Sequence, residues 1–94
     1  HVAEQRDRYR RRRELLRPAL EAAGFRIEDS EGSLYLWATR GEDGRRSVER
    51  LADLGILVAP GEFYGEAARP FVRVALTGTD ERIAAAAARL RGTR

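Results

Sequence analysis

A strand–turn–strand pattern in the last third of the chain constrains its fold more than any other feature. A short apolar run at 56–58 leads into a Pro-Gly turn at 60–61, and a second apolar run follows at 71–76. Short apolar runs bounded by Pro and Gly are typical of buried strands. One charge, Arg73, interrupts the second run. Burying a guanidinium is costly unless an anion meets it, so the pattern predicts that Arg73 receives a negatively charged group.

Helices and a second pair of strands are expected in the rest of the chain. Apolar residues recur at helical spacing over 2–23, where Gly24 should end the helix and Pro18 should kink or restart it. The other expected elements are strands at 25–28 and 34–39 joined by a turn at 29–32, a helix at 45–54, a structured loop at 60–70, and a helix at 80–91 capped by Thr79.

This order of elements predicts a single α+β domain over residues 1–94. We expect a two-layer sandwich, in which a mostly antiparallel sheet carries helices packed mainly on one side. A chain of 94 residues is long enough for one domain with a thin core.

Composition excludes several kinds of site. The chain has no cysteine, and His1 is its only histidine. A thiolate or histidine metal site and a Ser-His-Asp triad are therefore excluded. We assign no catalytic residue and no metal ligand. No apolar run approaches the roughly 20 residues of a membrane helix, and no signal-peptide pattern is present, so we expect a cytoplasmic protein without a membrane partner.

The basic excess of the chain lies at its N-terminus. The net charge is +3, and residues 1–17, which include the run Arg10-Arg11-Arg12-Arg13, hold that excess. One interpretation is a nucleic-acid-binding or acid-binding helix. The other is a solvated helix face that is partly neutralised by Glu4, Asp7 and Glu14. We favour the second and expect no specific nucleic acid, because no aromatic stacking platform accompanies the arginines.

Four aromatic residues lie near the two apolar runs. Tyr35 and Tyr64 either line a pocket or pack in the core, since a buried phenol needs a polar partner. For Trp37 and Phe63 we favour core packing. Arg73 has two interpretations as well, because an arginine on the solvent face of an edge strand would pair with a nearby acid such as Glu62 or Glu66.

Several motifs, in order and over about residues 5–91, carry a resemblance to a known family. These are Gly24-Phe25, the run 32–37, Leu51-Ala52 with the run 55–61, the run 71–76, and the final helix from Thr79 to Leu90. They resemble the C-terminal small domain of fold-type-I, class I/II aminotransferases, which depend on pyridoxal phosphate. The runs 34–39 and 61–65 are most similar to the succinyldiaminopimelate aminotransferases.

The resemblance implies that Arg73 binds the substrate α-carboxylate, and we name Tyr64 and Tyr35 as further candidate substrate-binding residues. A bidentate guanidinium suits carboxylate binding better than the point charge of a lysine. The family often has Phe where Tyr64 stands, which leaves open whether Tyr64 forms a hydrogen bond to the ligand.

The resemblance also implies that the parent enzyme transfers an amino group between an amino acid such as glutamate and a 2-oxo acid. In lysine biosynthesis that oxo acid would be N-succinyl-2-amino-6-oxopimelate. The parent enzyme is expected to be a homodimer. The alternative is a non-enzymatic α+β module that binds nucleic acid or an acidic partner.

The chain contains no lysine, since all 18 of its basic residues are arginine. Aminotransferases of this kind hold the cofactor as a Schiff base on a lysine amine. We therefore expect this chain to bind no cofactor by itself and to be inactive alone. Because it also has no methionine, we expect a piece of a longer enzyme whose partner is its own N-terminal cofactor-binding domain.

Overall fold

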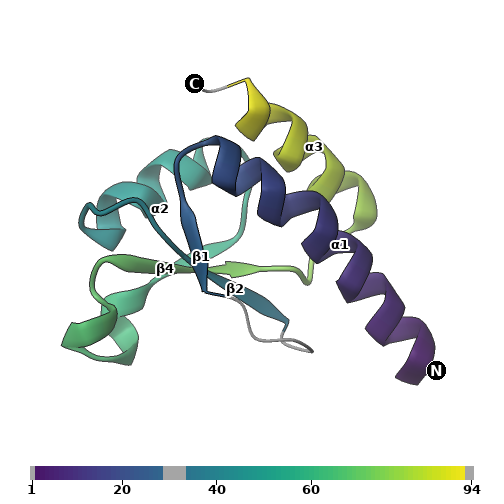
Figure 1. Cartoon of the computed structure of the whole chain (residues 1–94), viewed down its shortest axis with the longest axis horizontal. Helices are drawn as coiled ribbons and strands as arrows, with labels where there is room; N and C mark the ends of the chain where they lie inside the picture. Colours follow the sequence, from purple (N-terminus) through teal and green to yellow (C-terminus); the bar gives the residue numbers. More distant parts are fainter. Residues whose placement is uncertain (1, 29–33, 93–94) are drawn as a thin grey trace.

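The computed structural model describes residues 2–28 and 34–92 and confirms an α+β fold with a four-stranded antiparallel sheet. All three α-helices lie on the same side of the sheet (Figure 1). In chain order the elements are α1 (Val2–Ala22), β1 (Arg26–Glu28), β2 (Tyr35–Thr39), α2 (Gly44–Ala52), β3 (Val58–Pro60), the short 3-10 helices η1 (Gly61–Tyr64) and η2 (Glu66–Ala68), β4 (Phe71–Ala75) and α3 (Asp80–Arg91).

The strands are ordered β1-β2-β4-β3, and each neighbouring pair is antiparallel. The predicted pairing of the strands around 25–28 and 34–39 is confirmed, whereas their turn at 29–32 lies outside the described residues. The strand that carries Arg73 is central, between β2 and β3, and not an edge strand. Trp37 and Ala59 are the register partners of Arg73 on either side.

The core lies between the sheet and the helices and is almost entirely aliphatic. Side chains alternate along each strand, so that Leu36, Val72 and Val74 point toward the helices and are fully buried. From the helices, the buried apolar side chains include Leu16, Leu20, Leu51, Ile83, Ala86 and Leu90. Within residues 2–28 and 34–92, this arrangement leaves the opposite face of the sheet without an α-helix, and we call it the helix-free face.

The third strand begins two residues later than the sequence predicts, and the end of α2 explains why. Gly55 has a φ of 81°, and the N–H of Ile56 donates to the carbonyl of Leu51. This is the six-to-one hydrogen bond of a Schellman cap, which a glycine at positive φ permits. Ile56 is thus part of the helix end and is buried. The carbonyl of Leu57 accepts from the N–H of Ala75 at 3.0 Å, and β3 itself begins at Val58. The prediction of a strand at 56–58 is therefore wrong for Ile56, and the strand that forms is shifted toward Pro60.

The helix at the N-terminus is continuous through Pro18, so the predicted restart is absent. Proline removes one backbone hydrogen bond from a helix interior. Burial of Leu16, Ala19 and Leu20 on either side of Pro18 holds the helix together at this point. The final helix is confirmed, with the Thr79 hydroxyl oxygen accepting from the N–H of Arg82 at 3.1 Å.

The expected structured loop between β3 and β4 consists of η1 and η2 and is held tightly against β4. A Cβ atom at Gly61 would lie 2.0 Å from the carbonyl oxygen of Ala68 and 2.6 Å from that of Phe71. No side chain fits at such distances, so glycine is required for this close approach. The loop is thereby fixed beside the helix-free face of the sheet. Within residues 2–28 and 34–92, no helix has the length and apolar character needed to cross a membrane.

Candidate functional site

Arg73 projects from the middle of β4 onto the helix-free face of the sheet. Its neighbours Val72 and Val74 point into the core, as the alternation predicts. The guanidinium is partly buried, and its Nε is inaccessible to water and has no hydrogen-bond partner. A buried N–H donor without an acceptor costs free energy, which an anionic ligand would recover.

Both predicted tyrosines lie against this guanidinium. The Cζ atom of Arg73 is 4.0 Å from the ring centroid of Tyr35 and 5.2 Å from that of Tyr64. These distances are within the range of cation–π attraction. The two rings hold the charged group in place without using its N–H donors. The structure thus brings Arg73, Tyr35 and Tyr64 together, although they come from β4, β2 and η1.

The acids that an edge-strand interpretation would pair with Arg73 are engaged with other arginines. Glu62 forms ion pairs with Arg45 and Arg69, and Glu66 pairs with Arg69 at 3.1 Å. Among the described residues, none gives Arg73 a carboxylate partner. The alternative interpretation, in which Arg73 pairs with Glu62 or Glu66, is therefore wrong.

These ion pairs form a charged cluster where η1 and η2 meet the start of α2. The Glu66 carboxylate raises the pKa of Arg69. A hydrogen bond from the backbone N–H of Arg45 lowers the pKa of Asp43, which is also the N-cap of α2. The cluster fastens the loop that carries Tyr64 to the first turn of α2.

The prediction that Phe63 and Trp37 pack in the core is wrong. Phe63 lies on η1 and is 69% exposed. Trp37 is half-buried on the helix-free face, where its ring meets that of Tyr64 edge-on at 5.3 Å and 90°. Its position follows from strand alternation, since Leu36 and Ala38 occupy the core side.

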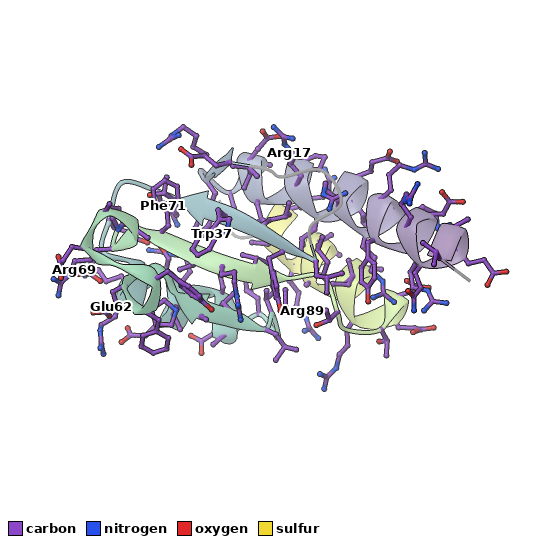
Figure 2. All side chains as sticks on the ribbon, turned by 90° about the horizontal axis from the view of Figure 1, so that it is seen from below. Arg17, Trp37, Glu62, Arg69, Phe71 and Arg89 are labelled. Carbon is purple, nitrogen blue, oxygen red and sulfur yellow. The ribbon has the colours of Figure 1, made fainter. Side chains whose placement is uncertain are left out.

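Phe71 belongs to the same face and was not singled out from the sequence. Figure 2 shows Trp37 and Phe71 toward the same end of the molecule as Glu62 and Arg69, which belong to the loop of η1 and η2. The sequence could have identified Phe71, because it lies two residues before Arg73 on β4 and side chains two residues apart on a strand point to the same face.

The arginine run of α1 is not a uniformly solvated face. Arg12 is buried, where its Nε donates to Asp80 at 2.7 Å and its guanidinium also donates to the carbonyl of Leu76 at 2.8 Å. Arg10 pairs with Asp7 on the same helix. The prediction of a solvated face is therefore wrong for Arg12, which joins α1 to the start of α3.

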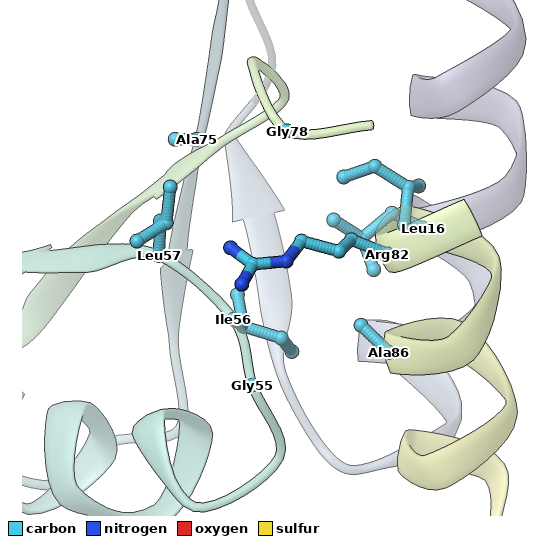
Figure 3. Close-up of a pocket in the computed structure, with 9 residues that line it drawn as sticks. Leu16, Gly55, Ile56, Leu57, Ala75, Gly78, Arg82 and Ala86 are labelled. Carbon is cyan, nitrogen blue, oxygen red and sulfur yellow. The ribbon is translucent and has the colours of Figure 1, made fainter. Parts of the chain in front are cut away.

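A small hollow lies between α3 and the connection from α2 to β3, and it shares no residue with Arg73, Tyr35 or Tyr64 (Figure 3). Arg82 reaches into it beside Ile56 and Leu57. Its volume is about 20 Å³, which is room for a single water molecule. Among the described residues, no group of His, Cys, Asp and Glu side chains could hold a metal ion.

Comparison with known proteins identifies the family of this chain. The model of the aminotransferase class I and II family matches residues 1–90, and the chain belongs to that family. A curated relative from Streptomyces rimosus, 4-dedimethylamino-4-oxo-anhydrotetracycline transaminase OxyQ, is 70% identical over 96% of the chain and 25% of its own length. An LL-diaminopimelate aminotransferase from Oleidesulfovibrio alaskensis is 38% identical over 95% of the chain and 24% of its own length.

A solved structure confirms the fold. The aromatic aminotransferase from Pyrococcus horikoshii superposes with a TM-score of 0.81 and 26% identity, over 96% of this chain and 25% of that one. The chain spans about a quarter of the length of the relatives that it matches.

The residues present do not fit the anchor that pyridoxal phosphate requires in this family. A Schiff base needs a lysine amine, and the chain has none. The site described above instead offers a guanidinium and two phenol rings, which suit a carboxylate and not the aldehyde carbon of the cofactor.

Proposed function

We propose that this chain is the C-terminal small domain of a pyridoxal-phosphate-dependent aminotransferase, in which Arg73 binds the α-carboxylate of the substrate. The observation that carries the proposal is the state of the Arg73 guanidinium. It is held between Tyr35 and Tyr64, its Nε is buried without an acceptor, and the acids nearby are paired with other arginines.

A carboxylate would complete this site chemically. A planar guanidinium grips a carboxylate with two parallel hydrogen bonds, and the partly buried setting strengthens them. Tyr35 and Tyr64 restrict the guanidinium before the ligand arrives, which reduces the entropy that binding costs. Fixing the carboxylate orients the rest of the substrate relative to the cofactor, which the remainder of the enzyme would supply.

The experiment is a kinetic comparison in the full-length protein that contains this chain. Replacing Arg73 by Ala should lower kcat/KM for an amino-acid donor such as glutamate by roughly 30-fold to several thousand-fold, which corresponds to about 2–5 kcal/mol. Arg73→Lys should recover part of this loss. The visible absorbance of the cofactor should stay unchanged in both variants.

Arg46 is the matched control, since it is an exposed arginine on α2 away from the site. Arg46→Ala should leave kcat/KM within about twofold of the wild type. Near-wild-type kcat/KM in Arg73→Ala, with an amino-acid donor, would show that Arg73 does not bind the carboxylate.

Two acceptor substrates have specific support. The diaminopimelate aminotransferases among the relatives support an oxo acid of lysine biosynthesis such as N-succinyl-2-amino-6-oxopimelate. The relative at 70% identity supports a ketone of the oxo-anhydrotetracycline type, and we favour it because the identity is much higher. Assaying both acceptors with glutamate as donor decides between them. Efficient transfer to the succinylated oxo acid alone would reverse the preference.

We further propose that the parent enzyme is a cytoplasmic homodimer and that the chain alone is inactive. The alternative of a nucleic-acid-binding module has less support, because Arg12 is buried in an ion pair and Arg10 pairs with Asp7. Nucleic-acid binding should be weak and should vanish as salt is raised.

A further inference from the structure

A hollow of about 380 Å³ lies on the helix-free face of the sheet. It is lined by Trp37, Tyr64 and Phe71, by Ala67 and Ala68, and by Glu28. The volume is within the range of small-molecule sites. The carboxylate role of Arg73 involves neither Trp37 and Phe71 nor the two alanines.

The walls of this hollow are held in place from several directions. Trp37 and Phe71 come from neighbouring strands, β2 and β4, whose pairing fixes their separation. Tyr64 meets the Trp37 ring edge-on at 5.3 Å. Gly61 packs against the carbonyls of Ala68 and Phe71, so the loop that carries Tyr64 and the alanines cannot drift from the sheet. The hollow is therefore formed before any ligand binds.

The chemistry of the lining favours a flat ring. Of the six lining residues, three are aromatic and two are alanines, which leave room beside the rings. Aromatic groups attract one another in edge-on or offset arrangements beyond the gain from burial alone. The carboxylate of the lining residue Glu28 is paired with Arg26 at 3.0 Å, and the Arg26 guanidinium carbon lies 5.7 Å from the Phe71 ring centroid.

Tyr64 connects the hollow with Arg73. One tyrosine ring contacts both the indole of Trp37 and the guanidinium of Arg73. In the sheet, Trp37 is also the direct register partner of Arg73. An anion bound to Arg73 and a ring bound in the hollow would therefore both lie beside Tyr64.

We propose that this hollow binds the planar aromatic part of a substrate whose carboxylate is held by Arg73, and that Trp37 and Phe71 determine the preference for aryl-bearing acids over saturated ones. The proposal rests on the carboxylate role of Arg73 proposed above. It assigns a substrate class, acids that carry a flat ring system, and a site for that ring.

Trp37 makes the test direct, because it is the only tryptophan and its indole N–H gives a single nuclear magnetic resonance signal. The 94-residue chain is titrated with 3-(2-naphthyl)propanoate and with its fully saturated decalin counterpart, which has the same charge and tether. The naphthyl acid should move the Trp37 signal and bind roughly three- to tenfold more tightly. Equal affinity of the two acids, or a Trp37 signal that the naphthyl acid does not move, would overturn the proposal.

Two variants and a control locate the ring. Ala67→Leu fills the hollow from an exposed position and should abolish the preference for the naphthyl acid, and Phe71→Leu should reduce it. Phe63→Ala removes an exposed ring outside the hollow and should change neither affinity. If Ala67→Leu and Phe71→Leu leave the preference intact while the acids still bind, the ring sits elsewhere and the proposal is wrong.

Arg73→Gln separates this proposal from the one on which it rests. It should weaken both acids equally and leave the naphthyl preference in place. If Arg73→Gln changes neither affinity while the Trp37 signal still moves, the carboxylate role fails and the ring site stands. If Arg73→Gln weakens both acids but no preference exists in the wild type, the carboxylate role stands and the ring site fails.

Discussion

The two faces of the sheet are built from different kinds of side chain, although they share the same strands. The covered face presents Leu36, Val72 and Val74 to the helices, and these are fully buried. The helix-free face presents Trp37, Phe71 and Arg73, which are only partly buried. The difference teaches that strand parity places the aliphatic core on one face of β2 and β4, and the ligand-binding role that we propose on the other.

Two arginines show the same division. Arg12, near the covered side, is buried and has an ion pair with Asp80 and a hydrogen bond to the Leu76 carbonyl. Arg73, on the helix-free face, has two aromatic rings against it and a buried Nε without an acceptor. We expect the first to contribute to the free energy of unfolding and the second to binding.

The largest effect should come from truncating the covered face. Leu36→Ala should lower the free energy of unfolding by about 3 kcal/mol, because it removes buried methyl groups and leaves a cavity. Leu57→Ala is the matched control, at a leucine that is 56% exposed, and should change it by less than about 0.5 kcal/mol. Urea denaturation followed by circular dichroism measures both. Equal losses would contradict the assignment of the core to the covered face.

Replacing Arg12 by Met should have the next largest effect. The change keeps the length of the side chain but removes a charged hydrogen bond and a donor to a buried carbonyl, which should cost about 2 kcal/mol. Arg11→Met, at an exposed neighbour on the same helix, is the control and should be nearly neutral. If urea denaturation gives the two variants the same stability, Arg12 does not join α1 to α3 energetically.

Arg73→Met should change the free energy of unfolding by less than about 1 kcal/mol, since only cation–π contacts with Tyr35 and Tyr64 are lost. Loss of an uncompensated buried donor offsets part of even that cost. Thermal and urea unfolding of the variant are the measurements. A loss as large as that of Arg12→Met would make Arg73 a structural residue and break the comparison.

The smallest effect concerns pH. The hydrogen bond from Arg12 holds the pKa of Asp80 below 3.8. A carboxyl with a lowered folded-state pKa contributes stability above its unfolded pKa, and that contribution disappears as pH falls through the folded value. Asp80→Asn should therefore destabilise the chain at pH 7, and the difference from the wild type should shrink below about pH 4. Glu81→Gln, in the same helical turn, controls for the helix dipole; a pH-independent difference for Asp80→Asn would contradict the prediction.

Local rules predicted much of the fold. Alternation placed Val72 and Val74 opposite Arg73, and Thr79 with its acidic neighbours marked the start of α3. The sequence also named Arg73, Tyr35 and Tyr64, but their meeting depends on strand order and on the position of η1, which no local pattern contains.

The misses have definite physical causes. Ile56 looked like strand because it is apolar, yet it completes the cap of α2 through its N–H. Trp37 and Phe63 looked like core because they are large and apolar, but one lies on the helix-free face and the other on an exposed turn. Arg12 was grouped with its charged neighbours, although it lies four residues before the buried Leu16 and so on the packed stripe of α1.

The order of the strands has a consequence for how copies of this chain meet in solution. Both edges of the sheet are three-residue strands, and unpaired edges are the places where sheets recruit further strands. One edge carries the exposed charges Arg26 and Glu28, and the other ends in Pro60, which has no N–H to offer. Such edges resist continuation into larger sheets, so a concentrated sample should be protected from fibrillar growth.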